Sequence, residues 1–274
     1  MYSQLQYNLS SKRGVYVITT NNLLQNPIDV NAIVFDLGST LVKHVPGEYI
    51  ASWEAVRTIL TENSPSLEQV HKLWIPTWHA TRGQGKRLHE RNRLYFQLLL
   101  AKLGYDVELS HPDIERALSI YYDKIVSLTT IYPDVKPVLM ELIKRQFQLA
   151  VLTNASKQWA KPVLEKQGIK KLITNAVISD LLPWEKPHPE IFTYTCKLID
   201  SEPRNTLYVG DSIYHDIYGG FTAGMRTCLI QRGGETANIG HVMPDVTADL
   251  TICSLDELPP LLFHLNYESN IRKK

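Results

Sequence analysis

The sequence predicts an α/β fold in which a doubly wound parallel β-sheet carries an inserted all-helical domain. Two observations lead to this prediction. Short apolar runs rich in β-branched residues recur along the chain with helical stretches between them, and residues 46–128 contain no strand pattern. Alternation of this kind is typical of a buried parallel sheet with helices on both faces. The 274 residues are enough to bury a core without disulfides or a structural metal.

The elements follow in order along the chain. Residues 1–30 form a polar N-terminal extension in which only residues 14–18 fit an edge strand. Residues 156–168 and 189–200 have the spacing of helices. The core is expected to comprise residues 31–45 and 129–264, followed by a tail over residues 265–274. Its strands are expected at residues 32–36, 149–152, 176–178, 206–209, 227–230 and 249–252.

The segment over residues 46–128 interrupts this alternation. Apolar side chains recur there at helical spacing, as at Trp53, Val56 and Leu60. A helical module is therefore expected after the first strand. Within it, Trp74 and Trp78 are four residues apart, a spacing that suits a buried helix face better than a ligand-binding box.

Composition excludes several classes of protein. The 29 Lys and Arg residues balance 28 Asp and Glu residues, whereas a general nucleic-acid binder carries a basic excess. No apolar run approaches the roughly 20 residues that span a bilayer, and the N-terminus lacks the apolar region of a secretory signal. The three cysteines have no CxxC spacing. We therefore expect a cytoplasmic protein that binds neither nucleic acid nor membrane.

Polar side chains follow several of the predicted strands, where parallel strands bring their carboxyl ends to one edge of the sheet and where ligands bind. Carboxylates suit a hard cation such as Mg²⁺, while lysine and backbone N–H groups offset phosphate charge. The sequence therefore predicts a site for a phosphoryl group and Mg²⁺. Its candidate residues are Asp36, Thr153, Asn154, Asp211 and Asp216 after strands, and Lys186 in the loop over residues 184–190.

These segments, in this order, resemble the four motifs of the haloacid dehalogenase superfamily of phosphohydrolases. The resemblance covers residues 31–260, with the helical segment in the place of that family's mobile cap. It implies hydrolysis of a small phosphorylated metabolite through an aspartyl-phosphate on Asp36. It also implies that Lys186 orients this nucleophile and that the Thr153 hydroxyl, helped by Asn154, binds a phosphoryl oxygen.

The same resemblance implies a Mg²⁺ site. Asp36, Asp211 and the backbone carbonyl of Gly38 are the expected ligands. Asp216 is expected either to join this metal site through a bound water or to pair with Lys186. In the nucleophile loop, Ser39 and Thr40 are expected substrate-binding positions, with a mainly structural role for Thr40.

Gly38 departs from the family pattern. Most of these phosphatases carry an Asp there, which protonates the leaving group and then activates water. Without it, we expect a preference for good leaving groups, with His44, Glu48 or another cap residue as candidate acids. The alternatives are a weak or inactive module that binds a phosphorylated ligand or a protein, and a haloacid dehalogenase. The acids at Asp211 and Asp216, and the lack of that branch's Tyr at position 38, disfavour the dehalogenase.

A basic segment lies at residues 82–93 of the helical module. Five Lys and Arg residues stand there against one acid. This pattern fits a solvated helix face, and it also fits a surface that grips an anionic substrate when the cap closes. In the second case, Arg82 and Lys86 are the expected contacts. Trp184, beside Lys186, is expected at the entrance of the site.

Overall fold

The computed structural model describes residues 30–43, 47–81, 88–232 and 245–262. Six parallel strands form one sheet with the order β5-β4-β1-β6-β7-β8. The first strand of the chain is therefore central, with β4 and β6 on either side. The predicted parallel sheet is confirmed, and its strands are β1 (Ala32–Phe35), β4 (Gln148–Thr153), β5 (Asn175–Ile178), β6 (Thr206–Gly210), β7 (Arg226–Ile230) and β8 (Leu250–Ile252).

Helices cover both faces of the sheet. Side chains of β1 alternate between two hydrophobic clusters, with Ile33 and Phe35 in one and Ala32 and Val34 in the other. The first cluster includes α5 (Val135–Lys144) and α6 (Lys157–Lys166), and the second includes α7 (Pro189–Leu198). This arrangement confirms a doubly wound fold. Shorter turns complete it: the 3₁₀ segments η1 (Ile169–Lys171), η2 (Ser179–Leu181), η3 (Pro203–Asn205) and η5 (Leu255–Glu257), the π-helix η4 (Ile213–Tyr218) and α8 (Gly219–Thr222).

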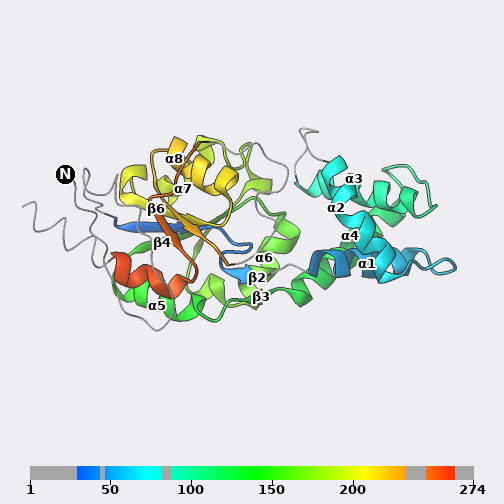
Figure 1. The fold of residues 1–274 in the computed structure, drawn as a ribbon, viewed down its shortest axis with the longest axis horizontal. Helices are drawn as coiled ribbons and strands as arrows, with labels where there is room; N and C mark the ends of the chain where they lie inside the picture. Colours follow the sequence, from blue (N-terminus) through cyan, green and yellow to red (C-terminus); the bar gives the residue numbers. More distant parts are fainter. Residues whose placement is uncertain (1–29, 44–46, 82–87, 233–244, 263–274) are drawn as a thin grey trace, which may run out of the picture.

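The inserted module is a group of four helices that lies beyond one end of the sheet (Figure 1). It enters and leaves through a two-stranded antiparallel ribbon of β2 (Val42–Lys43) and β3 (Thr130–Ile131). Both connections to the core thus pass through one ribbon. The predicted helical cap is confirmed, and its helices are α1 (Gly47–Ile59), α2 (Leu67–Ala80), α3 (Leu88–Lys102) and α4 (Pro112–Leu128).

Local sequence signals set the ends of the cap helices. Ser66 begins α2 with a capping box, in which its hydroxyl accepts the Gln69 N–H and the Gln69 side chain accepts the Ser66 N–H. Pro112 stands in the first turn of α4, where a missing N–H costs nothing. At the other end of α4, Thr129 donates its hydroxyl to the Ile125 carbonyl.

The described helices include none that is long and apolar enough to cross a membrane. The edge strand predicted at residues 14–18, the rest of the N-terminal extension, and the C-terminal tail lie outside the described part of the chain.

Candidate active site

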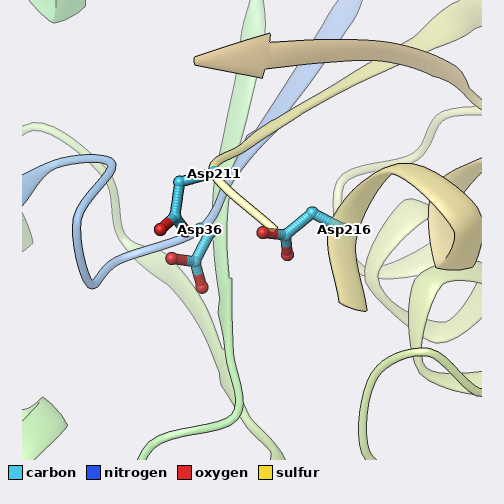
Figure 2. A group of neighbouring side chains, drawn as sticks. All are labelled: Asp36, Asp211 and Asp216. Carbon is cyan, nitrogen blue, oxygen red and sulfur yellow. The ribbon is translucent and has the colours of Figure 1, made fainter. Parts of the chain in front are cut away.

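Three carboxylates meet at the carboxyl edge of the sheet. Asp36 follows β1 and Asp211 follows β6, and these strands are neighbours, with Phe35 in register with Val209. Asp216 lies in the π-helix η4. An oxygen of each carboxylate lies within 4.8 Å of the other two, and Figure 2 shows the three groups converging from the two strand ends and the helix. The fold thus brings the three acids together, as the sequence predicts.

Lys186 joins two of the acids. Its side chain is only 3% exposed, and its Nζ donates to Asp36 Oδ1 at 2.7 Å, Asp216 Oδ1 at 2.6 Å and the Tyr208 hydroxyl at 2.9 Å. An ammonium group has three hydrogens, and each has an acceptor here. Burial alone would lower the pKa of Lys186, but the Asp216 and Asp36 carboxylates raise it above its ordinary value. Lys186 therefore stays charged.

The acids remain under electrostatic strain despite this lysine. Burial raises the pKa of Asp36 to about 6; Lys186 opposes this shift, whereas Asp216 adds to it. Burial, followed by the charges of Asp36 and Asp216, also raises the pKa of Asp211 well above its ordinary value. One ammonium thus faces three clustered carboxylates. A cation would relieve the remaining repulsion, and carboxylate oxygens are donors that suit Mg²⁺.

Asp216 is held in place by its surroundings. Its Oδ1 accepts from Lys186, its Oδ2 accepts the Ser212 N–H at 2.9 Å, and the Tyr208 hydroxyl lies 3.1 Å from Oδ1. A Cβ atom on Gly210 would overlap the Asp216 carboxyl group, so only glycine fits there without a shift. Of the two roles expected for Asp216, the structure shows the pairing with Lys186.

Thr153 and Asn154 follow β4 and line the same cavity as the acids. The Thr153 hydroxyl accepts the Ala155 N–H at 3.3 Å. Asn154 was expected to bind substrate, but both ends of its amide hold the backbone of Lys186. Its Nδ2 donates to the Lys186 carbonyl and its Oδ1 accepts the Lys186 N–H, each at 2.8 Å. Asn154 therefore holds the loop that carries Lys186, and its expected contact with substrate stays a prediction.

The loop after β1 places its two expected substrate-binding residues, Ser39 and Thr40, in different surroundings. Gly38 and Ser39 line the cavity, and Ser39 has a left-handed backbone with φ of 57°. Thr40 is fully buried and is not among the cavity-lining residues, while its carbonyl accepts Arg232 Nε at 2.9 Å. This burial fits the mainly structural role expected for Thr40, and a contact of Thr40 with substrate stays a prediction.

A cavity of about 530 Å³ lies over the acids, with walls from core loops and cap helices. Trp74 is buried in the main hydrophobic cluster and Trp78 packs against that cluster, as predicted for this helix face, and both also line the cavity, as does Glu48. Trp184 was expected at the entrance, but its side chain is exposed and is not among the lining residues. Arg82, Lys86 and His44 lie outside the described residues.

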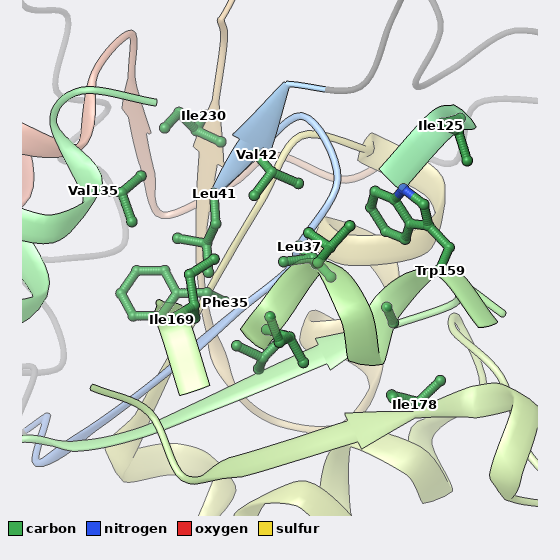
Figure 3. Packing of buried hydrophobic residues seen from close by; sticks show 14 of the residues in the cluster. Phe35, Leu37, Leu41, Val42, Ile125, Val135, Trp159, Ile169, Ile178 and Ile230 are labelled. Atoms are coloured by element: carbon green, nitrogen blue, oxygen red, sulfur yellow. The ribbon is translucent and has the colours of Figure 1, made fainter. Parts of the chain in front are cut away.

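Sequence reasoning missed Tyr208 and Trp159. The Tyr208 hydroxyl accepts from Lys186 and lies 3.2 Å from the Leu152 carbonyl oxygen, so it lies between β4 and the acids. The one feature of the sequence that could have indicated Tyr208 is its hydroxyl, which stands near the end of an otherwise apolar strand. Trp159 of α6 lines the cavity beside Ile125 of the cap helix α4, as Figure 3 shows. No local pattern marks a core tryptophan as part of a ligand cavity.

Comparison with known proteins agrees with this geometry. A family model for haloacid dehalogenase-like hydrolases matches residues 30–224. The chain belongs to this family. A glyceraldehyde 3-phosphate phosphatase of Methanopyrus kandleri is 32% identical over 206 residues, which cover 74% of this chain and 85% of the relative. A phosphoglycolate phosphatase of Pasteurella multocida is 36% identical over 194 residues, 70% of this chain and 81% of the relative.

Solved structures of the haloacid dehalogenase-like family have the same fold. A crystal structure of a predicted phosphoglycolate phosphatase from Haemophilus somnus 129pt matches with a TM-score of 0.66. It is 22% identical and covers 86% of this chain and 100% of that chain. Together with the family match and the two phosphatase relatives, it confirms the prediction of a phosphatase-type hydrolase with an α/β core and a helical cap.

Proposed function

We propose that this protein is a Mg²⁺-dependent phosphohydrolase that cleaves a small phosphorylated metabolite through an aspartyl-phosphate on Asp36. One observation carries the proposal. Asp36 lies at the floor of a cavity, held by a buried Lys186 that also binds Asp216, with Asp211 beside them. The named relatives act on phosphoglycolate and glyceraldehyde 3-phosphate, which supports a phosphorylated metabolite as substrate.

Each side chain has a definite part in this reaction. Lys186 occupies Asp36 Oδ1 and keeps the carboxylate ionised, which leaves Oδ2 to attack phosphorus. The bond from phosphorus to the leaving oxygen breaks, and that oxygen takes the electron pair. Water then attacks the phosphorus of the aspartyl-phosphate, which releases phosphate and restores the Asp36 carboxylate.

The rest of the site would bind the phosphoryl group. Asp36, Asp211 and the Gly38 carbonyl would hold Mg²⁺, which supplies positive charge against the phosphoryl oxygens. The hydroxyls of Ser39 and Thr153 line the cavity and would donate to these oxygens. Asp216 and Asn154 would position Lys186.

Phosphate release from 4-nitrophenyl phosphate and acetyl phosphate tests the proposal. Turnover should require Mg²⁺, stop with chelator and vanish in Asp36→Asn, which keeps the shape of the side chain but removes the nucleophile. Asp123→Asn, an exposed carboxylate on α4, is the matched control and should retain turnover. Turnover that survives chelation or Asp36→Asn would overturn the mechanism. Absence of all turnover in folded, Mg²⁺-binding protein would favour the catalytically inactive binding module.

A further inference from the structure

The cavity is larger than a phosphoryl group requires. Its volume of about 530 Å³ falls in the range of roughly 300–1,000 Å³ that holds drug-sized ligands. The acids, Lys186 and Thr153 line the part that the core contributes. The space beside the cap therefore belongs to the rest of the substrate, the part that departs as the leaving group.

Aromatic rings dominate that space. Three helices contribute them: α2 and α4 from the cap, and α6 from the core. Apolar side chains of Ile75, Leu88 and Ile125 line the same cavity. We call these rings the aromatic wall, and its members are Trp74, Trp78, Tyr121, Tyr122 and Trp159.

Neighbouring groups fix the orientation of these rings. The Trp78 and Tyr95 rings pack edge to face with centroids 6.2 Å apart, and the Arg91 guanidinium lies 5.0 Å from the Trp78 ring centroid. On α4, the Tyr122 hydroxyl accepts Asn92 Nδ2 at 2.9 Å. A wall that is already ordered loses little entropy when a ligand packs against it.

The Tyr121 and Trp159 rings are fixed in the same way. Tyr121 packs edge to face on Phe96 with centroids 5.4 Å apart. Trp159 donates its indole N–H to the Thr129 hydroxyl at 3.2 Å. Both ends of the wall, on the cap and on the core, are thus anchored.

The cap residues that the structure describes along the cavity carry balanced formal charge. Among the described lining residues contributed by the cap helices, Glu48 and Arg91 carry opposite charges, and His79 is the other titratable nitrogen base. The charges of these two described residues offset each other, so together they give a carboxylate on the leaving group no net attraction. An uncharged apolar group would gain from contact with the rings.

On the basis of the proposed function, we propose that the natural substrates are aryl phosphate monoesters whose planar leaving group packs against the aromatic wall. Gly38 supports this class independently, because it offers no proton to the departing oxygen. A phenolate, with a conjugate-acid pKa near 10 as for tyrosine, departs without that proton far more readily than an alkoxide. The aryl oxygen takes the electron pair as the phosphorus–oxygen bond breaks, and bulk water protonates it afterwards.

Two substrates separate ring recognition from leaving-group chemistry. Phenyl phosphate and 2-naphthyl phosphate release oxygens of similar basicity but differ by one ring. We expect kcat/KM to be about tenfold higher for the naphthyl ester, mainly through KM, because the second ring buries further apolar area. Trp78→Leu should bring this ratio close to one. Trp184→Leu, which replaces an exposed tryptophan outside the cavity, should leave the ratio unchanged.

The outcomes distinguish this inference from the proposed function. Equal kcat/KM values for the two esters, or an unchanged ratio in Trp78→Leu, would overturn ring recognition while Asp36-dependent turnover of acetyl phosphate still supported the phosphatase. Loss of all turnover would overturn the phosphatase and, with it, the assignment of these esters as substrates, but not the binding of a ring by the wall. In that case, calorimetric binding of the two esters to wild type and Trp78→Leu would still decide whether the wall selects a ring.

Discussion

At the scale of single residues, the site depends on how little space surrounds Asp216. Gly210 ends β6, and a side chain there would occupy the position of the Asp216 carboxyl group. That carboxyl group accepts hydrogen bonds from Lys186 and the Ser212 backbone. The position of Lys186 thus depends on the absence of a methyl group at position 210.

Gly210→Ala should therefore reduce activity more than it reduces stability. We expect kcat/KM for acetyl phosphate to fall at least 100-fold, while overpacking costs about 1–3 kcal/mol of unfolding free energy. Gly104→Ala is the control: its φ of +89° strains alanine, but no atom lies within 4 Å of the added Cβ. It should cost about 1 kcal/mol with unchanged kcat/KM. Urea unfolding and steady-state kinetics give both quantities, and equal activity losses would contradict the coupling.

Gly38 permits a test of the missing proton donor. It does not have a positive φ, so an Asp can adopt its backbone conformation without strain. Gly38→Asp should raise kcat/KM for phosphoglycolate relative to 4-nitrophenyl phosphate by about 10²-fold, because general acid catalysis helps a basic alkoxide most. Gly38→Asn, of the same shape but without an acid, should not change this ratio. If Gly38→Asp and Gly38→Asn change this ratio equally, the lack of a proton donor at position 38 does not limit the hydrolysis of phosphoglycolate.

At the scale of elements, the ion pair of Arg232 and Asp134 joins four chain segments, one of which is the loop after β1. Arg232, after β7, donates to both oxygens of Asp134 at 2.9 and 3.0 Å and to the Thr40 carbonyl. Its guanidinium also lies 3.9 Å from the Tyr132 ring centroid. Asp134 accepts the Leu255 N–H at 2.7 Å, which adds the segment after β8. The ends of the cap ribbon are thereby fixed to the core.

Asp134→Asn should make stability less sensitive to acid. Burial would raise the pKa of Asp134, but hydrogen bonds from Arg232, Ser254 and Leu255 and the Arg232 charge together lower it below its ordinary 3.8. Because the folded-state pKa lies below the unfolded one, the carboxylate stabilises the fold above about pH 4. That contribution disappears as the pH falls through the folded-state pKa.

Urea unfolding from pH 7 to pH 3 measures this effect. At pH 7 we expect the Asn variant to lose about 3 kcal/mol of unfolding free energy, since a buried Arg232 loses its counter-charge. The difference from wild type should shrink below pH 4. Glu141→Gln breaks an exposed pair with Arg145 on α5 and should cost at most about 0.5 kcal/mol. A difference that stays constant with pH would exclude a charge effect at Asp134.

The elements also show what a sequence can predict. The strands of the main sheet were predictable because each is an apolar run, and Asp36, Asp211 and Lys186 were predictable because strand ends and their loops share one edge. The strands β2 and β3 contain two residues each, too few for any periodicity to mark. The contacts of Asn154, Tyr208 and Arg232 join residues far apart in the chain, so local pattern carries no trace of them.

At the scale of the whole molecule, the cavity exists only because the cap and core are held together. The spacing of Trp74 and Trp78 predicts a buried helix face, which the structure confirms, but it does not show that the same face also lines a cavity, because that depends on where the cap lies against the core. Trp159 of α6 and Ile125 of α4 belong to the same hydrophobic cluster as the sheet residues, so this cluster continues into the cap (Figure 3). The shape of the cavity therefore depends on the cap and the core together and cannot be assigned to either part alone.

The end of α6 secures this assembly. Gln167 donates its Nε2 to the Thr129 carbonyl at 2.8 Å and accepts the Ile131 N–H at 3.2 Å. Lys166 donates to the carbonyls of Val126 and Ser127 at the end of α4. One helix of the core thus holds both the last cap helix and the returning strand of the ribbon.

Gln167→Ala should loosen the cap without unfolding the core. Two lost hydrogen bonds, at about 1 kcal/mol each, should speed amide exchange in β3 and the last turn of α4 by at least tenfold and leave β1 unchanged. Gln97→Ala removes a similar amide contact, to Val107, wholly inside the cap and should leave β3 unaffected. Because four of the five rings of the aromatic wall lie on the cap and the fifth, Trp159, lies on the core, KM should rise more for 2-naphthyl phosphate than for acetyl phosphate in Gln167→Ala. Amide exchange in β3 could become faster while the KM values for the two substrates change equally. This result would mean that the attachment of the cap does not affect binding of the ring to the aromatic wall.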